Sequence, residues 1–502
     1  NIHIVDENQL NEEQKQFCFN YFTEVISPRI VPLIIRKNTK IPFLADDNIY
    51  HAVKMIWKKT SRYAIIQIPV NSSCPRFVKL PSEGSRHDII YIDDIIRFCL
   101  NDIFFMFSNE EIFAYTFKLT RDAQFLLDDD VSKSLMEKME KGIENRLHGL
   151  PVRLAYDKDM PEDLLEMILS KLKLKEHDSV EAGGRYHLKR DLMKFPKVRP
   201  DLEYAHQPPL RHQSIKPFSS ILNIINRRDV LLNYPYHTFS HFIDFLREAA
   251  IDPKVKSIYI TLYRTAEHSK VINALVNAAK NGKEVIVLLE LFARFDEEQN
   301  VENSEILQKA GVKVIHGVEG LKVHCKLLLI QRKEGVALKG YTYIGTGNFN
   351  EITSSLYTDF GLFTSNQQIA ADAKSIFDFL VSPYRHFSCN KLLVSPYYMR
   401  DRFEELIEKE IKNAKKGRKA FIYAKFNSLT DEKIISLLYK ASQAGVEVRL
   451  IVRGSFCLQP QVKDMSENIR AISIVDKYLE HARLLIFHNG GDEQMFTLSA
   501  DW

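Results

Sequence analysis

The chain has 502 residues, 45% of them hydrophobic, and a formal net charge of +4. This length is too great for one hydrophobic core, so we expect roughly two to four domains. So small a net charge excludes the global signature of a nucleic-acid-binding protein, and no apolar run approaches the roughly 20 residues of a membrane helix. The six scattered cysteines include no Cys-x-x-Cys pair, which indicates reduced thiols in a cytoplasmic protein rather than a disulfide framework or a zinc site.

Residues 1–206 form the first region, and their patterns predict a packed α+β scaffold. The expected elements are an amphipathic helix over 11–26, a hairpin of strands 49–57 and 63–70, and helices over 88–104, 132–147 and 161–173. No catalytic set of residues is visible here, so a scaffold is a better interpretation than a second active site. Five prolines between 195 and 217 then mark a domain boundary.

The rest of the chain contains one pattern twice. In 211–391 a strand (258–263), a helix (270–280), a glycine and a strand (284–291) follow one another, and in 392–502 the same order recurs as 421–426, 431–443, a glycine and 447–452. The two glycines, Gly282 and Gly445, fit helix C-terminal caps. An internal repeat of this kind predicts two tandem α/β domains.

Each repeat then presents a histidine followed two residues later by a basic residue, inside an apolar stretch that we interpret as a strand. The pairs are His324 with Lys326 and His481 with Arg483. Side chains two apart on a strand point the same way, which suits a nucleophile beside a phosphate-binding cation. A single histidine in a strand is more often a core or surface residue than a catalyst, but two copies at matching places favour function.

Basic and small residues follow several of the predicted strands. Arg264, Arg294 and Arg453 stand at or just beyond strand ends, where parallel α/β sheets collect their ligands. The turn that contains Gly345, Thr346, Gly347 and Asn348 lets backbone N–H groups approach an anion closely. The pattern predicts a local anion site in a protein of low net charge.

Long, ordered phrases of this region resemble the phospholipase D superfamily, and within it the bacterial polyphosphate kinase family. They are ITLYR (260–264), ELFARFDEE (290–298), GLKVHCK (320–326), GTGNFNE (345–351), LYTDF (356–360), AISIVDKYLEH (471–481) and SADW (499–502). The resemblance implies an α/β fold with two tandem phospholipase D-like α/β domains, 211–391 and 392–502, preceded by an α+β middle domain, 1–206, that shapes a substrate tunnel and a dimer. Family members also carry an N-terminal helical domain with an adenine-contacting asparagine and extend beyond the second motif, so we expect this chain to be a fragment.

The resemblance implies an ATP:polyphosphate phosphotransferase. In this reading His324 takes the γ-phosphate of ATP as phosphohistidine and passes it reversibly to the end of an inorganic polyphosphate chain. Asp359 or Glu351 orients the His324 ring, and the resemblance favours Asp359. His481 acts as acid/base or nucleotide contact. The residues expected to bind ATP or phosphate are Tyr357, Arg453, His481, Lys326, Arg483 and Asn348.

Magnesium is the cofactor that the resemblance implies, with Arg264 and Arg294 at the metal–phosphate contact. A guanidinium has no lone pair to offer a metal, so we expect both arginines to grip phosphate oxygens that Mg²⁺ also touches. The carboxylates of residues 296–298 either hold the metal's waters or form a solvated acidic turn. The expected partners are ATP, ADP and polyphosphate, but no nucleic acid, in a cytoplasmic homo-oligomer, a dimer or a tetramer. Peripheral attachment to the inner membrane is left open.

Two other functions compete with this one. A phospholipase D-like phosphodiesterase or nuclease would use the same two histidines without ATP, and a catalytically silent protein would only bind polyanions. The wider superfamily has Asp five residues after each motif's Lys, where this chain has Gln331 and His488. That departure and the extra arginines favour the kinase.

Overall fold

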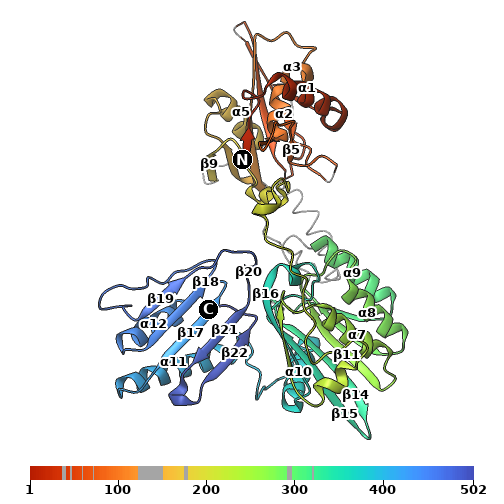
Figure 1. Cartoon of the computed structure of the whole chain (residues 1–502), viewed down its shortest axis with the longest axis vertical. Coiled ribbons are helices and arrows are strands. Elements are labelled where there is room, and N and C mark those ends of the chain that lie inside the picture. Colours follow the sequence, from red (N-terminus) through yellow and green to blue (C-terminus); the bar gives the residue numbers. More distant parts are fainter. Residues whose placement is uncertain are drawn as a thin grey trace. The chain divides into compact units, whose positions relative to one another are not determined.

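The computed structural model of the chain describes residues 1–36, 41–45, 48–58, 60–71, 73–121, 151–174, 179–290, 297–318 and 321–502. The chain divides into two compact units, Asn1–Ala205 and His206–Trp502, and each is considered by itself (Figure 1).

The first unit is an α+β domain. Its strands are β1 (Ile2–Val5), β2 (Leu33–Ile35), β3 (Tyr50–Trp57), β4 (Thr60–Gln67), β5 (Phe77–Lys79), β6 (His87–Tyr91), β7 (Glu111–Arg121), β8 (Pro151–Asp157) and β9 (Ser179–Gly183). Its helices are α1 (Glu12–Tyr21), α2 (Ile92–Phe98), α3 (Leu100–Ile103) and α5 (Glu162–Leu172). The strands form one sheet in the order β2-β4-β3-β7-β8-β9 and a second in the order β1-β6-β5.

Most elements predicted for this unit are confirmed. A capping box at Asn11 starts α1, and a π-helical turn, Phe22–Ile26, continues it to the predicted end. The hairpin is β3 paired antiparallel with β4, and α5 begins after Pro161. The predicted helix over 132–147 lies outside the described residues.

The predicted helix over 88–104 is wrong at its start. Residues His87–Tyr91 form strand β6, which lies between β1 and β5, and helix begins only at Ile92. Asp88 is buried and accepts a hydrogen bond from the Gln14 side chain at 2.9 Å. Pairing with two neighbouring strands outweighs the local helical pattern, because the consecutive isoleucines Ile89 and Ile90 suit a strand equally well.

The second unit begins with an α/β half. Its elements are α6 (Ile221–Ile225), β10 (Val230–Tyr234), α7 (Ser240–Ile251), β11 (Val255–Leu262), α8 (Lys270–Lys280), β12 (Glu284–Leu289), α9 (Glu297–Lys309), β13 (Lys313–His316), β14 (Lys326–Glu334), β15 (Ala337–Gly345), β16 (Tyr357–Thr364) and α10 (Gln367–Val381). The sheet order is β10-β16-β15-β14-β11-β12-β13, with β20 attached to β16.

Helices cover both faces of this sheet. In Figure 1, α10 lies on the opposite side of the strands from α7 and α8. On the α10 side, Phe377 packs in a cluster with Tyr259 and Leu329. Ile258 and Ile260 are also buried but alternate to the other face, where α7 and α8 lie. The apolar run of β11 is therefore buried on both sides, as in parallel sheets.

The second half repeats this topology in fewer residues. Its elements are α11 (Met399–Lys415), β17 (Phe421–Phe426), α12 (Glu432–Gln443), β18 (Glu447–Val452), β19 (Ile469–Ile472), β20 (Leu479–Glu480), β21 (Arg483–Phe487) and β22 (Gln494–Leu498). The order β19-β18-β17-β21-β22 matches β13-β12-β11-β14-β15, with the same parallel and antiparallel pairs.

The local signals of the repeat also agree. Ser269 caps α8 and Asp431 caps α12, each accepting backbone N–H groups of the first turn. Gly282 and Gly445 follow these helices with φ of 75° and 91°, the left-handed conformation that favours glycine. The predicted internal repeat is confirmed.

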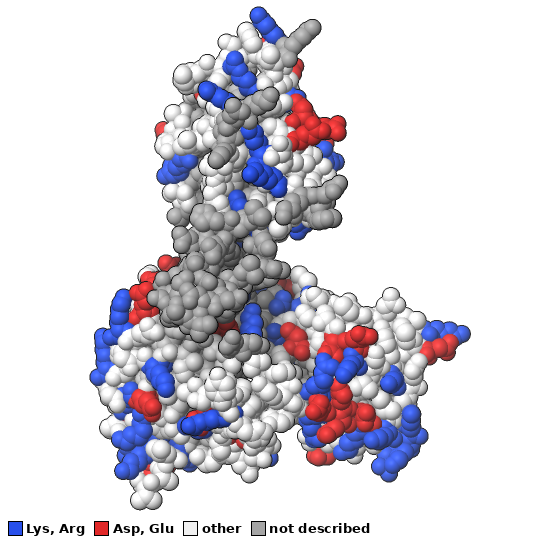
Figure 2. All heavy atoms as spheres, turned by 180° about the vertical axis from the view of Figure 1, so that it is seen from behind, with Lys and Arg blue, Asp and Glu red and all other residues white. Residues whose placement is uncertain are grey.

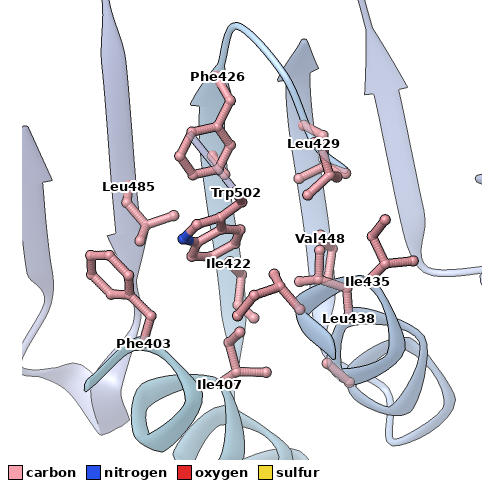
Figure 3. Packing of buried hydrophobic residues seen from close by; sticks show 14 of the residues in the cluster. Phe403, Ile407, Ile422, Phe426, Leu429, Ile435, Leu438, Val448, Leu485 and Trp502 are labelled. Atoms are coloured by element: carbon pink, nitrogen blue, oxygen red, sulfur yellow. The ribbon is translucent and has the colours of Figure 1, made fainter. Parts of the chain in front are cut away.

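The sheet of the second half buries one face beneath α11 and α12. Figure 3 shows Phe403 of α11 and Leu438 of α12 directed at the strands, with Trp502 packed beside Phe426. Lys425 of β17 alternates to the opposite face and contacts Thr358 of the first half. One face thus forms the core, and the other meets the neighbouring half.

Charge and hydropathy of the described residues agree with the composition. On the face drawn in Figure 2, lysines and arginines are interspersed with acidic side chains, in keeping with the net charge of +4. Across the described ranges no helix combines the length and apolar character that crossing a membrane requires.

Candidate active site

The two histidines of the repeated motif lie just before their strands. Strand β14 begins at Lys326 and β21 at Arg483, so the prediction that His324 and His481 are strand residues is wrong by two positions. The hydroxyl of Thr261 explains why strand β14 begins at Lys326 and not before His324. It donates to the Cys325 carbonyl at 2.7 Å and accepts the Leu327 N–H at 3.1 Å, in place of a strand partner.

His324 is held in one tautomer. Its Nδ1 lies 2.9 Å from the backbone carbonyl of Ser499, which belongs to the second half. A carbonyl can only accept, so Nδ1 carries the proton and Nε2 keeps its lone pair. Burial, together with the positive charge of Lys326, lowers the pKa of His324 to about 3. The ring is therefore neutral near neutral pH, with Nε2 ready to act as a nucleophile.

His481 is oriented by a carboxylate from the other half. Its Nδ1 donates to Asp359 at 2.8 and 3.0 Å, and Asp359 is 4% exposed. Burial lowers the pKa of His481, while the carboxylate raises it and reduces the shift. The prediction that Asp359 or Glu351 orients His324 is therefore wrong. Asp359 holds His481, and Glu351 accepts the Lys270 N–H at the start of α8.

The Asp359 carboxylate is itself fixed. Thr346 donates its hydroxyl hydrogen to Asp359 at 2.5 Å. Gly347 passes so close that an added Cβ would lie 2.3 Å from the carboxylate Oδ2, nearer than any real Cβ approaches. The Gly-Thr-Gly turn therefore fixes the position of the Asp359 carboxylate, a role that the sequence did not reveal.

Lys326 is a cation buried next to His324. It is 2% exposed, and its Nζ donates to the His324 carbonyl at 2.5 Å. Burial and the charge of Arg483 lower the pKa of Lys326 to about 7. The ring of Tyr263 lies 5.3 Å from the ammonium and packs edge-on against His324 with centroids 4.9 Å apart. An anion that reaches this ammonium would favour its charged form.

Two arginines of the second half belong to one hydrogen-bonded chain. Arg483 donates to His481 Nε2 at 3.1 Å and to both carboxylate oxygens of Asp501 at 3.1 and 3.2 Å. The backbone N–H of Asn427 also donates to Asp501, and the Asn427 side chain accepts from Arg453 at 2.6 Å. Arg483 is thus positioned beside His481, and Arg453 is linked to Arg483 through Asn427 and Asp501.

The remaining predicted residues are distributed as follows. Tyr357 packs against the His481 ring with centroids 5.2 Å apart, and its phenol lies within electrostatic reach of Arg453. The charge of Arg264 contributes to the lowered pKa of Lys326, so Arg264 lies near the site. The Oδ1 of Asn348, beside Gly347, is buried and has no hydrogen-bond partner in the part of the chain that the structure describes. Arg294 and Asp296, with the side chains of residues 297 and 298, lie outside the described residues.

Four supporting residues were missed by the sequence reasoning: Ser499, Asp501, Thr346 and Asn427. Ser499 acts through its carbonyl, which every residue possesses, so no sequence signal exists for it. Asp501 and Thr346 stand in phrases that carried the resemblance, but their partners are remote in sequence.

The described residues contain no group of three or more His, Cys, Asp or Glu side chains that could hold a metal ion. The side chains of the described residues therefore do not form a complete set of protein ligands for Mg²⁺.

The fold and the site together define a class. Two sheets of the same topology each contribute one histidine and one basic residue to a single site, and each histidine is oriented by a group from the other half. These are the two tandem α/β domains that the sequence predicted, and together they form one site.

Comparisons with known proteins then specify the family. Family models described as polyphosphate kinase middle domain, C-terminal domain 1 and C-terminal domain 2 match residues 13–195, 220–386 and 392–502. The polyphosphate kinase of Vibrio vulnificus (strain CMCP6) is 44% identical over 506 residues, which cover 100% of this chain and 72% of that protein. That of Escherichia coli (strain K12) is 44% identical over 508 residues, with 100% and 74% covered.

A solved structure agrees with these relatives. The crystal structure of polyphosphate kinase from Porphyromonas gingivalis matches with a TM-score of 0.83 at 34% identity, covering 100% of this chain and 74% of that one. The chain belongs to the polyphosphate kinase family, as the repeated motifs had indicated.

Proposed function

We propose that this chain transfers the γ-phosphoryl group of ATP to inorganic polyphosphate through a phosphohistidine at Nε2 of His324. The observation that carries the proposal is the contact of Nδ1 with the Ser499 carbonyl at 2.9 Å. Because that contact leaves Nε2 unprotonated and the lowered pKa keeps the ring neutral, the nucleophile needs no separate general base.

Both half-reactions balance without a further reactant. Nε2 of His324 forms a bond to the γ-phosphorus while the bond to the leaving ADP oxygen breaks. A terminal phosphate oxygen of polyphosphate then attacks the same phosphorus, and the nitrogen–phosphorus bond breaks to restore neutral His324. Each step reverses in the same way, so the reaction runs in both directions.

The cations of the site supply the electrostatic part of the reaction. Phosphoryl transfer depends on positioning and on neutralising charge around the transferred group. Lys326 and Arg264 approach from the first half, and Arg453 and Arg483 from the second. Arg294 is proposed for the same role on the resemblance alone. Each charge-assisted hydrogen bond contributes about 1.5–3 kcal/mol, so several are needed to hold an anion as strongly hydrated as polyphosphate.

His481 is proposed to contact the phosphates on the ADP side. Its Nε2 accepts from Arg483, and its Nδ1 donates to Asp359. The carboxylate stabilises a positive charge on the ring, so His481 can take up a proton when phosphate oxygens approach. Tyr357, whose ring packs on His481, is proposed to contact the nucleotide, and Asn348 is proposed to donate its side-chain NH₂ hydrogens to phosphate oxygens.

Magnesium is proposed to arrive with the nucleotide. When bound, the ion would neutralise charge on the phosphate oxygens, and Arg264 and Arg294 would bind phosphate oxygens beside it. On the resemblance we further propose a cytoplasmic homo-oligomer, which size-exclusion chromatography with light scattering tests.

The direct test is chemical labelling. The whole protein is incubated with γ-labelled ATP and Mg²⁺ and quenched in base, and the acid-labile phosphate is mapped, with His324→Ala and the exposed-residue control His386→Ala alongside. We expect label on His324 in the wild type and in the control, its loss in His324→Ala, and its release by added ADP. Hydrolysis of a phosphodiester without any labelled histidine would instead support the phosphodiesterase alternative.

A further inference from the structure

The two halves of the second unit are joined at Thr358. Strand β16 of the first half pairs in parallel with β20 of the second, with Tyr357 opposite Leu479 and Thr358 opposite Glu480. Thr358 is 8% exposed and stands directly before Asp359, while Glu480 stands directly before His481. The residues that hold the two sheets together are therefore the immediate neighbours of an active-site pair.

The Thr358 hydroxyl uses its full hydrogen-bonding capacity. It accepts the backbone N–H of His481 at 3.2 Å and the ammonium of Lys425 at 3.3 Å. It donates to Glu480 Oε2 at 3.1 Å, with the Leu479 carbonyl at 3.4 Å as the alternative acceptor. A hydroxyl has one hydrogen to donate and two lone pairs, so all three are engaged.

The partners of Thr358 also bind each other. Lys425 of β17 lies 2.6 Å from the same Glu480 oxygen, and the side chains of both residues are largely shielded from water, at 14% and 21% exposed. Thr358, Glu480 and Lys425 form a closed triangle of hydrogen bonds from three strands. Because the triangle includes charged groups away from bulk water, its bonds are stronger than neutral surface contacts.

His481 is consequently held at two points by consecutive residues of β16. Asp359 accepts from its ring, and Thr358 accepts from its backbone N–H. A side-chain contact alone leaves the main chain free to shift, and a backbone contact alone leaves the ring free to rotate. Together they define both the place and the direction of Nε2.

We propose that Thr358 is a positioning residue of the phosphotransfer reaction, acting on His481 through its hydroxyl and the Glu480–Lys425 pair. This inference rests on the proposed role of His481. Thr358 does not touch the reacting atoms, so its loss changes the rate of phosphoryl transfer more than substrate binding. Small displacements of positioned groups cost up to about a hundredfold in rate.

The test compares substitutions that keep or remove the hydroxyl. Thr358→Val is nearly isosteric and removes it, and Thr358→Ser keeps it. Thr342→Val is the matched control, because Thr342 is a fully buried threonine of the adjacent strand β15 whose hydroxyl has no partner among the described residues. For each variant kcat, KM for ATP and for polyphosphate, and the melting temperature are measured on the whole protein, and Lys425→Met is measured as a second perturbation of the triangle.

We expect kcat of Thr358→Val to fall by about ten- to a hundredfold. KM for ATP should rise by a smaller factor than kcat falls, because His481 is also proposed to contact the nucleotide phosphates, and KM for polyphosphate should change less than about threefold. Thr358→Ser should restore kcat to within about twofold, and Thr342→Val should match the wild type. Lys425→Met should lower kcat by a smaller factor, with little change in KM for polyphosphate. The comparison of kcat values requires only that each variant folds, which its melting temperature verifies.

Equal kcat for Thr358→Val and Thr342→Val would overturn the proposal, as would a serine variant as impaired as the valine variant. A rise in KM for polyphosphate in Lys425→Met without a fall in kcat would overturn it too, because that lysine would then bind substrate rather than hold Glu480. Failure of the proposed function is distinguishable, since it appears as unlabelled His324 in the wild type.

Discussion

His324 and His481 share a tautomer but differ in the group that holds it. A neutral carbonyl accepts from His324, and a carboxylate accepts from His481. The pKa of His324 falls to about 3, whereas Asp359 offsets part of the lowering at His481. In the proposed function His324 stays neutral to attack phosphorus and His481 gains a proton beside phosphate oxygens, and these two environments suit those proposed roles.

The first residue-scale prediction concerns Asp359. In Asp359→Asn the amide can turn its NH₂ group toward His481 and favour the wrong tautomer, so we expect kcat to fall by about 10²- to 10⁴-fold. The comparison variant is Glu351→Gln, which alters only the start of α8 and should retain most of kcat. Steady-state kinetics of both variants, in the direction of polyphosphate synthesis and in the direction of ATP synthesis, measure the difference in kcat. A larger kcat loss in Glu351→Gln than in Asp359→Asn would contradict the observed pairing.

The second residue-scale prediction concerns the buried ammonium of Lys326. Burial lowers its pKa from 10.5 to about 7, so the unfolded chain binds more protons than the folded one between these two pH values. The free energy of unfolding therefore rises with pH across that window, because less of the cost of burying a charged ammonium remains. Below the window the ammonium is charged in both states and the full cost of its burial applies. We expect Lys326→Met to raise the free energy of unfolding at neutral pH by about 2 kcal/mol, with the advantage shrinking as the pH rises.

Urea denaturation across that pH range measures the effect, and activity should be lost in the same variant. Lys322→Met is the control, because Lys322 is exposed and lies over the same Tyr263 ring at 5.4 Å. A variant at Lys326 that is less stable than the wild type at neutral pH would show that the ammonium stabilises the fold.

At the scale of elements, the connection between the two halves is anchored by one carboxylate. Asp372 of α10 is 2% exposed and accepts the backbone N–H groups of Asn390, Lys391 and Leu392 at 2.6 to 3.0 Å. These amides stand where the first half ends and the chain continues toward α11. The segment is irregular in structure, yet three consecutive backbone N–H groups are satisfied by one carboxylate.

Asp372→Asn should lower the free energy of unfolding by about 1–3 kcal/mol, because an amide is a weaker acceptor and adds hydrogens that lack partners. Asp378→Asn on the same helix is the matched control. Asp378 pairs with Lys374 at 2.5 Å near the surface, so its loss should cost less than about 0.5 kcal/mol. Urea denaturation measures both, and hydrogen exchange should quicken at residues 390–392 only in Asp372→Asn. Equal losses in the two variants would argue against the anchor.

At the scale of the whole molecule, the chain has two units with separate cores. The clusters that contain Val53 and Leu164 belong to the first unit, and those of Phe377 and Phe403 to the second. All the described site residues lie in the second unit. Ligand binding should therefore stabilise one unit far more than the other.

We expect calorimetry to resolve more than one thermal transition and polyphosphate to raise the transition of the second unit. At a concentration of about 100 Kd the added stability is about 2.7 kcal/mol. Leu164→Ala, at a fully buried position of the first unit, assigns the other transition by lowering it. Equal upward shifts of both transitions with polyphosphate would show that the substrate binds both units.

Much of the architecture follows from local patterns. The strands, helices and capping glycines of the repeat were placed from apolar runs and from Gly282 and Gly445, because these signals lie within a few residues of the elements they define. The residues 88–91 were misassigned, because helix and strand both suit the consecutive isoleucines, and only pairing with β1 and β5 decides between them.

The sequence by itself determined the duplicated halves, the two histidines, their basic neighbours and the family. Only the tertiary structure decided which group orients which histidine. Asp359 is 122 residues from His481, and Ser499 is 175 residues from His324. These pairs meet because β16 and β20 join the two halves, and a contact set by packing between sheets leaves no periodic or local trace in the chain.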